Sequence, residues 1–105
     1  MTNYRDNTYI ISWINDEFGI DPQDDNVDVI VEFASGEQFT ATFFALGNVQ
    51  SLLDKYNETG ECANGLYLWS AHMILITRLT KENVETAVAD LLTSGEFAEA
   101  FEGPL

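Results

Sequence analysis

The chain is most regular in the stretch Val27–Phe44, where it reads VDVIVEFASGEQFTATFF. In residues 27–33, Val and Phe alternate with mostly polar side chains, a period of two that predicts a strand with one buried face. Residues 38–44 return with the same period, and Gly36 between the two runs tolerates the positive φ that tight turns require. The stretch therefore predicts a β-hairpin, around which the rest of the sheet is expected to form.

The hydrophobic pattern outside this hairpin predicts one more strand, a second hairpin and two helices. Residues 9–14 are apolar on both alternating faces, as in an inner strand, and residues 66–69 and 73–78 are typical of two short strands. Apolar residues spaced by three and four positions predict a helix in two other places. These two stripes are Val49, Leu52, Leu53 and Tyr56, and Val84, Val88, Leu91 and Leu92.

Capping signals bound both predicted helices. Asn48 is a candidate N-cap and Gly60 a candidate stop for the first helix, while Thr80 and Gly95 have these roles in the second. Taken in order, the elements predict a single α+β domain over residues 1–105. Its expected architecture is an antiparallel sheet of about five strands, with the two helices packed on one face.

The composition excludes several classes of function. The 105 residues include 18 Asp and Glu but only 4 Lys and Arg, a net charge of −14, while 46% are hydrophobic. This apolar content predicts a folded domain with an acidic surface, although residues 1–8 and 96–105 are candidates for loose ends. Nucleic acid and anionic membranes are both excluded as direct partners, because each would require basic residues that the chain lacks.

The sequence gives no reason to expect export or a membrane span. Its longest apolar runs are far shorter than the roughly 20 residues that a membrane helix needs, and no secretory signal pattern is visible. Cys62 is the only cysteine, so no intramolecular disulfide is expected. A cytoplasmic location is therefore predicted.

The acidic charge is concentrated toward the two ends of the chain. Residues 1–37 have a net charge of −8, residues 38–81 have none, and residues 82–105 have −6. Five acids crowd between Asn15 and Val27, in a segment without apolar periodicity that is expected to be a loop, and Asp28 follows directly. For the acids of the second helix, a solvated surface is as good an explanation as binding. The loop acids instead suggest a patch that attracts a cationic partner, such as a protein that itself binds nucleic acid.

Two chemical sites are alternatives to that interpretation. Asp24, Asn26 and Asp28 match the first ligand spacings of a calcium loop. The positions that such a loop gives to Gly and Glu are Val and Ser here, so no metal is expected. Cys62 and His72 could form a nucleophile and base, but no Gly-rich oxyanion element surrounds the cysteine. The prediction is therefore a protein without catalytic residues or cofactor.

Three aromatic residues are a further candidate for binding. Trp13, Tyr67 and Trp69 are more typical of a core than of an interface in a domain of this size. Tyr67 and Trp69 nevertheless share one face of a predicted strand, and an open face would make them good anchors for a partner. The segment Gly60–Gly65 before them is loop-like and would present them.

Three segments of the chain resemble one bacterial family. They are residues 12–21, SWINDEFGID, residues 41–44, ATFF, and residues 60–69, GECANGLYLW. Over most of residues 9–100 the chain is similar to small acidic immunity proteins of contact-dependent growth inhibition systems. The resemblance implies a cytoplasmic antitoxin, without catalytic activity, that binds the C-terminal toxin domain delivered by a neighbouring cell. Such toxins are often nucleases, including RNases, and binding blocks the active site or a substrate surface.

The resemblance carries over no functional residues, because each immunity protein is fitted to its own toxin. The expected contacts therefore follow from charge and loop position: acids accept hydrogen bonds from toxin Lys and Arg. The expected contact residues are the acids Asp16, Glu17, Asp21, Asp24, Asp25 and Glu61, together with Trp69. The alternative function is an acidic nucleic-acid mimic or adaptor that binds many basic proteins, and the oligomeric state is left open.

Overall fold

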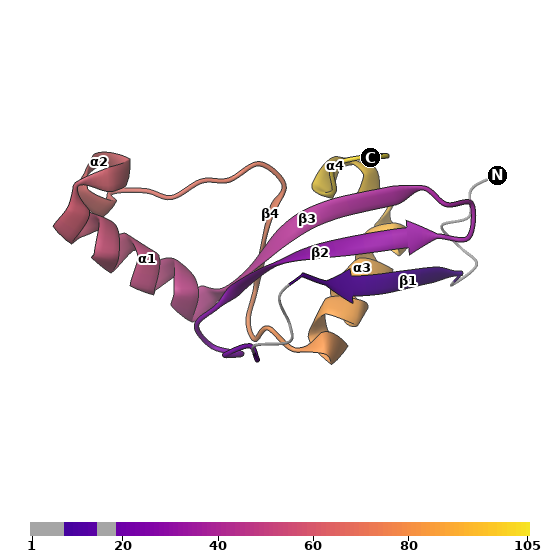
Figure 1. Cartoon of the computed structure of the whole chain (residues 1–105), viewed down its shortest axis with the longest axis horizontal. Coiled ribbons are helices and arrows are strands. Elements are labelled where there is room, and N and C mark those ends of the chain that lie inside the picture. Colours follow the sequence, from indigo (N-terminus) through magenta and orange to yellow (C-terminus); the bar gives the residue numbers. More distant parts are fainter. Residues whose placement is uncertain (1–7, 15–18) are drawn as a thin grey trace.

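The computed structural model describes residues 8–14 and 19–105, which form one small α+β domain, as the sequence predicts. The strands are β1 (Tyr9–Trp13), β2 (Asn26–Phe33), β3 (Gln38–Ala45) and β4 (Met73–Ile76). The helices are α1 (Leu46–Thr59), α2 (Glu61–Gly65), α3 (Lys81–Ser94) and α4 (Phe97–Ala100). The strands make a mixed sheet in the order β1-β2-β3-β4 (Figure 1). None of the helices in this described part of the chain is long and apolar enough to cross a bilayer.

The hairpin predicted from the alternating stretch is confirmed. β2 and β3 pair antiparallel, with Val29 opposite Ala41 and Val31 opposite Phe39. Residues opposite each other share a face of the sheet, and all four of these side chains are buried. β1 pairs antiparallel with the other edge of β2, which confirms a strand at the predicted place. It is an edge strand and not the expected inner one, because among the described strands only β2 pairs with it and its Ile10 side chain is exposed.

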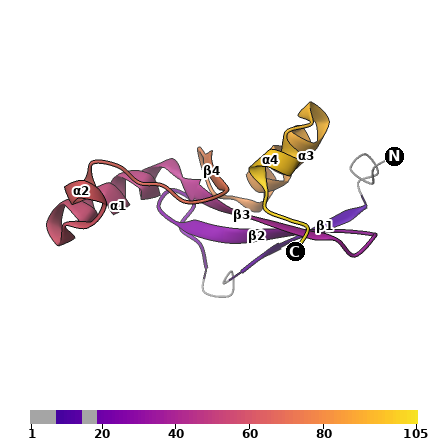
Figure 2. The ribbon, with the colours of Figure 1, turned by 90° about the horizontal axis from the view of Figure 1, so that it is seen from above.

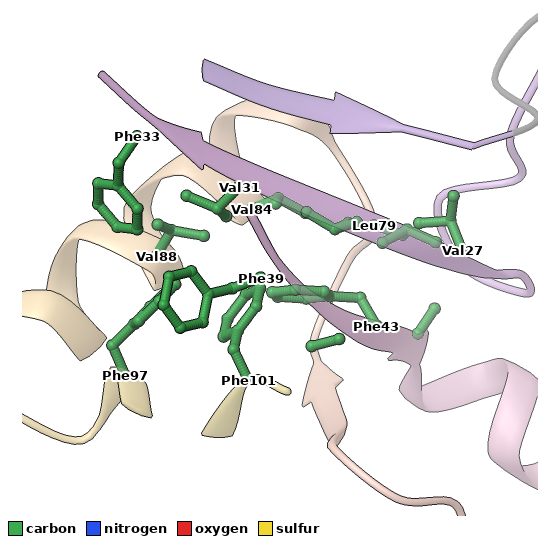
Figure 3. Packing of buried hydrophobic residues seen from close by; sticks show 13 residues of the cluster. Val27, Val31, Phe33, Phe39, Phe43, Leu79, Val84, Val88, Phe97 and Phe101 are labelled. Carbon is green, nitrogen blue, oxygen red and sulfur yellow. The ribbon is translucent and has the colours of Figure 1, made fainter. Parts of the chain in front are cut away.

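The core lies between one face of the sheet and the C-terminal helices. α3 contributes Val84 and Val88, while α4 and the residue after it contribute Phe97 and Phe101. Figure 2 shows α3 and α4 on the same side of the sheet, and Figure 3 shows their side chains meeting those of β2 and β3. The Phe97 ring packs against other phenylalanine rings at centroid distances of 4.4 to 5.7 Å. The sheet and these helices therefore share one continuous aromatic core.

The C-terminal segment extends this packing along the edge of the sheet. Glu102 forms an antiparallel bridge with Thr40 of β3, and the Leu105 amide donates to the Gln38 carbonyl oxygen at 2.8 Å. β4 pairs with β3 only over Thr42–Ala45, so the two segments divide the outer edge of β3 between them. Residues 96–105, candidates for a loose end, thus belong to the folded domain.

The prediction of about five antiparallel strands is wrong in detail. Residues 66–69 form no strand, and β4 runs parallel to β3, with Phe43 opposite Ile74. Parallel neighbours cannot be joined by a tight turn, because they need a crossover of a dozen or more residues. Residues 46–72 are that crossover, so the apolar run before β4 belongs to a connection and has no hairpin partner.

The predicted packing of both main helices on one face also needs correction. α3 does pack on the sheet, but α1 leaves the end of β3 and projects away from it (Figure 1). We call residues 46–72 the arm: it comprises α1, α2 and a return segment, residues 66–72, that leads to β4. The arm makes the molecule elongated, 49 × 25 × 21 Å, and no residue of α1 is buried.

The predicted N-cap of α3 is confirmed, and it provides a test of stability. The Thr80 hydroxyl oxygen accepts a hydrogen bond from the Asn83 amide at 3.1 Å. Because Thr80→Ala removes this acceptor, we expect it to lower the free energy of unfolding by about 1 kcal/mol in urea denaturation. Thr93→Ala, at an exposed position in the last turn of α3, should change it by less than about 0.5 kcal/mol. Equal losses in the two variants would contradict the capping role.

Candidate functional site

The acidic turn, residues 21–25, is held in one conformation by its own polar groups. The Asp24 amide donates to the Asp21 carbonyl oxygen at 3.2 Å, closing a β-turn that has Pro22 at its second position. One Asp21 carboxylate oxygen accepts from the backbone amide two residues later at 3.0 Å. The Asp25 carboxylate accepts from two backbone amides, at 3.2 and 3.0 Å. The negative charges of the turn are therefore fixed in position by local hydrogen bonds.

The acidic turn is also fastened to the first turns of α1. The two carboxylate oxygens of Asp24 accept hydrogen bonds from Asn48 Nδ2 at 3.1 Å and from Ser51 Oγ at 2.9 Å. Gly47 lies so close to the turn that a Cβ atom there would overlap the Gln23 carbonyl oxygen. Asn48 was predicted as the N-cap of α1 but does not cap it: its side chain binds Asp24 of the turn, and α1 begins two residues earlier.

The sheet face turned away from α3, which we call the open face, continues the acidic surface. It is made of the alternate residues of β1, β2 and β3 whose side chains point away from the core, including the exposed Ile10, Ser12, Asp28 and Glu32. Glu102, opposite Thr40, adds a third carboxylate to this face. None of the four strands contains Lys or Arg. Because the acidic turn leads directly into β2, the turn and the open face are neighbouring parts of one acidic surface.

The structure separates the residues that were expected to contact a toxin. Asp21, Asp24 and Asp25 lie together in the acidic turn, whereas Asp16 and Glu17 fall outside the described residues. Glu61 is the first residue of α2, beyond the far end of α1, a helix about 21 Å long. Trp69 lies on the return segment of the arm and is 70% exposed. Glu61 and Trp69 therefore belong to the arm and not to the acidic turn.

A base beside the acidic turn was missed by the sequence reasoning. The Leu79 amide donates to the Pro22 carbonyl oxygen at 2.7 Å, which places the start of α3 against the turn. Lys81 lines a hollow of about 240 Å³ together with Pro22 and Trp13. No local signal marks this contact, because its two sides lie far apart in the sequence. The turn itself still carries three carboxylates, so its immediate surroundings remain negative.

The two alternative chemical sites are not assembled. Within residues 8–14 and 19–105, no three His, Cys, Asp or Glu side chains are grouped in a way that could hold a metal ion. Asp28, from the calcium-like spacing, accepts a hydrogen bond from the Thr42 hydroxyl at 2.6 Å. Cys62 lies in α2 at the end of the arm (Figure 1), whereas His72 Nδ1 lies 3.3 Å from the Ala100 carbonyl oxygen. The cysteine and the histidine therefore do not form a pair.

Comparison of the chain with protein-family models, with curated proteins and with solved structures finds no match.

Proposed function

We propose that this protein is a cytoplasmic immunity protein that binds and neutralises a cationic toxin domain, a nuclease such as an RNase. The observation that carries the proposal is the acidic surface made by the acidic turn and the open face. A nuclease must hold the phosphates of its substrate with Lys and Arg, so its substrate surface is cationic. An acidic surface of fixed geometry competes with nucleic acid for that surface, and inhibition by occupancy needs no catalytic group.

The hydrogen bonds of the acidic turn support this function, because they reduce the cost of binding. A side chain that is already held in place loses less conformational freedom when a partner arrives. The bonds also divide the acids into two roles. Both carboxylate oxygens of Asp24 accept hydrogen bonds from Asn48 and Ser51, so Asp24 positions the turn. Asp21, Asp28 and Glu32 each accept a described hydrogen bond through one oxygen only, and these three acids are assigned to the cations of the toxin.

A protection experiment in cells tests the proposal. The chain would be co-expressed with the toxin domain encoded next to it and, separately, with an unrelated basic nuclease. We expect growth to be restored against the first enzyme and not against the second. Restored growth against both would favour the alternative function, an acidic nucleic-acid mimic or adaptor. No restored growth against either would contradict the proposal.

The acidic surface should set the rate of association with the toxin. Asp21→Asn, Asp28→Asn and Glu32→Gln together remove three negative charges with little change of shape. We expect the association rate constant to fall roughly tenfold at low ionic strength, because steering by complementary charge is lost. The difference should shrink at high salt, where exposed charges are screened. Stopped-flow mixing of the two proteins at two salt concentrations measures both effects.

A matched variant removes the same charge from the opposite side of the molecule. Glu82→Gln, Asp90→Asn and Glu99→Gln replace three exposed acids on α3 and α4. We expect these changes to slow association less than about twofold, because their charges do not face the toxin. If both triple variants slowed association equally, total charge alone would be responsible, and the assignment to the acidic turn and open face would be wrong.

A further inference from the structure

The arm exposes an apolar patch that no described part of the chain covers. Leu66, Tyr67 and Trp69 of the return segment are 79%, 50% and 70% exposed. Helix α1 forms no core with the rest of the arm, because the residues of its apolar stripe are only half-buried. The radius of gyration, 14.8 Å, exceeds the roughly 13 Å expected of a compact domain of this length. Large apolar side chains gathered in this way mark an interaction surface.

A strained turn holds this apolar patch in its exposed position. Cys62, Ala63 and Asn64 have φ angles of 50°, 52° and 63°, in the left-handed region that costs about 1–2 kcal/mol for each residue with a side chain. Gly65 follows and packs so closely on α1 that a Cβ atom would overlap the Leu53 carbonyl oxygen. The start of the return segment is thus fixed against α1 in spite of this conformational cost, so the patch begins at a defined position.

The distribution of charge indicates which partner fits the apolar patch. No Asp, Glu, Lys or Arg occurs from Cys62 to Thr77, so the return segment carries no charge. Elsewhere, two copies of a chain with a net charge of −14 repel each other, most strongly at the acidic turn and the open face. The uncharged patch is where two copies approach with least repulsion. A cationic toxin, by contrast, gains no electrostatic attraction there.

We infer that a second copy of this chain covers the apolar patch, so that two arms form a symmetric homodimer. With about 150–250 Å² for each large side chain, the three patch residues expose roughly 400 Å² per copy. Two patches together give about 800 Å², below the roughly 1,200 Å² at the lower limit of stable specific interfaces, so the dimer is expected to be a weak one. A dissociation constant in the micromolar range is therefore expected. The acidic surface stays free, and the inference does not depend on the proposed function.

Sedimentation of the purified protein, without any toxin, tests this inference. Between about 1 and 500 μM, we expect the mass to rise from that of the 11.8 kDa chain to twice that value. Added salt should strengthen this association, because it screens repulsion between two acidic chains. Leu66→Ser with Trp69→Ser should weaken the dimer at least tenfold. Both side chains are exposed in the single chain, so the variant should keep its melting temperature at low protein concentration.

A control variant removes two exposed apolar side chains elsewhere. Ile10 and Leu105 are 69% and 65% exposed, and Ile10→Thr with Leu105→Ser should leave the dimer intact. A wild-type mass of one chain at 500 μM would overturn the inference, and so would a dimer that persists in the arm variant or dissociates equally in the control.

The two proposals fail in distinguishable ways. Toxin binding should weaken with salt, whereas the dimer should strengthen with it. A single-chain mass, together with loss of toxin protection in the Leu66→Ser, Trp69→Ser variant, would overturn the dimer and assign the patch to the toxin. A dimer that gives no protection would overturn the proposed function alone.

Discussion

Phe97→Ala is expected to lower the free energy of unfolding by about 3–5 kcal/mol, the range for truncating a buried phenylalanine to alanine. The Phe97 side chain is 1% exposed. Its ring stacks on that of Phe101 at a centroid distance of 4.4 Å and meets the edges of Phe33 and Phe39 at 5.7 and 5.3 Å. Rings from two strands and the C-terminal segment would thus lose a common neighbour. Since domains of this kind have total stabilities of about 5–15 kcal/mol, the loss would leave a marginal fold.

Urea denaturation followed by circular dichroism would measure this loss, and a thermal scan should show a melting temperature lower by about 10 °C or more. Glu99→Ala is the matched control, because Glu99 is an exposed residue of the same short helix. It should change stability by less than about 0.5 kcal/mol. If Phe97→Ala were as mild as this control, α4 would not be part of the core, and the aromatic packing described here would be incorrect.

The parts of the fold that the sequence predicts are those encoded by neighbouring residues. The hairpin follows from strict alternation on both sides of Gly36, and α3 follows from a stripe bounded by Thr80 and Gly95, which do cap it. Each of these elements carries its pattern and its end signals within about fifteen residues. A strand at β1 was predictable for the same reason: its apolar run ends where the acidic segment begins.

The parts that were missed depend on contacts between distant segments. The run from Leu66 to Trp69 has strand-like composition, but it follows the left-handed turn at Cys62–Asn64 at the far end of the arm, where the sheet offers no partner strand. β4 then pairs parallel to β3, a choice that no local pattern distinguishes from a hairpin. The pairing of Glu102 with Thr40 is equally invisible in the sequence. Local sequence patterns therefore predict individual helices and strands, while tertiary packing decides which strands pair and in which direction.

The candidate site shows the same division. The crowding of acids before β2 is a property of composition and could be read directly. The role of each acid could not be predicted in this way, because Asp24 binds Asn48 and Ser51 of a helix that follows more than twenty residues later. Lys81 likewise reaches the acidic turn only through tertiary packing. Charge can therefore be located from sequence, whereas a carboxylate that binds a partner cannot be distinguished from one that positions a loop.

The last prediction concerns Gly47, where the acidic turn meets α1. A change from Gly to Ala inside a helix normally stabilises a protein by up to about 1 kcal/mol. Here the new Cβ atom would overlap the Gln23 carbonyl oxygen, so either the turn or the helix must move. Movement of the turn would break the hydrogen bonds that Asp24 accepts from Asn48 and Ser51. Bonds to a charged group contribute about 1.5–3 kcal/mol each, so we expect Gly47→Ala to destabilise the protein by about 2 kcal/mol.

Hydrogen exchange identifies which amides Gly47→Ala destabilises, and by how much. The Leu79 and Ala45 amides donate to carbonyl oxygens of Pro22 and Asp25 in the acidic turn, at 2.7 and 3.0 Å. Both amides should lose protection in Gly47→Ala, while the hydrogen-bonded amides of residues 29–33 and 38–41, farther along the β2–β3 hairpin, keep theirs. Gln50→Ala, at an exposed position of the same helix, should leave both groups unchanged. A stabilised Gly47→Ala variant would mean that the turn moves freely on α1, and the acidic surface would then lack the fixed geometry on which toxin binding is proposed to depend.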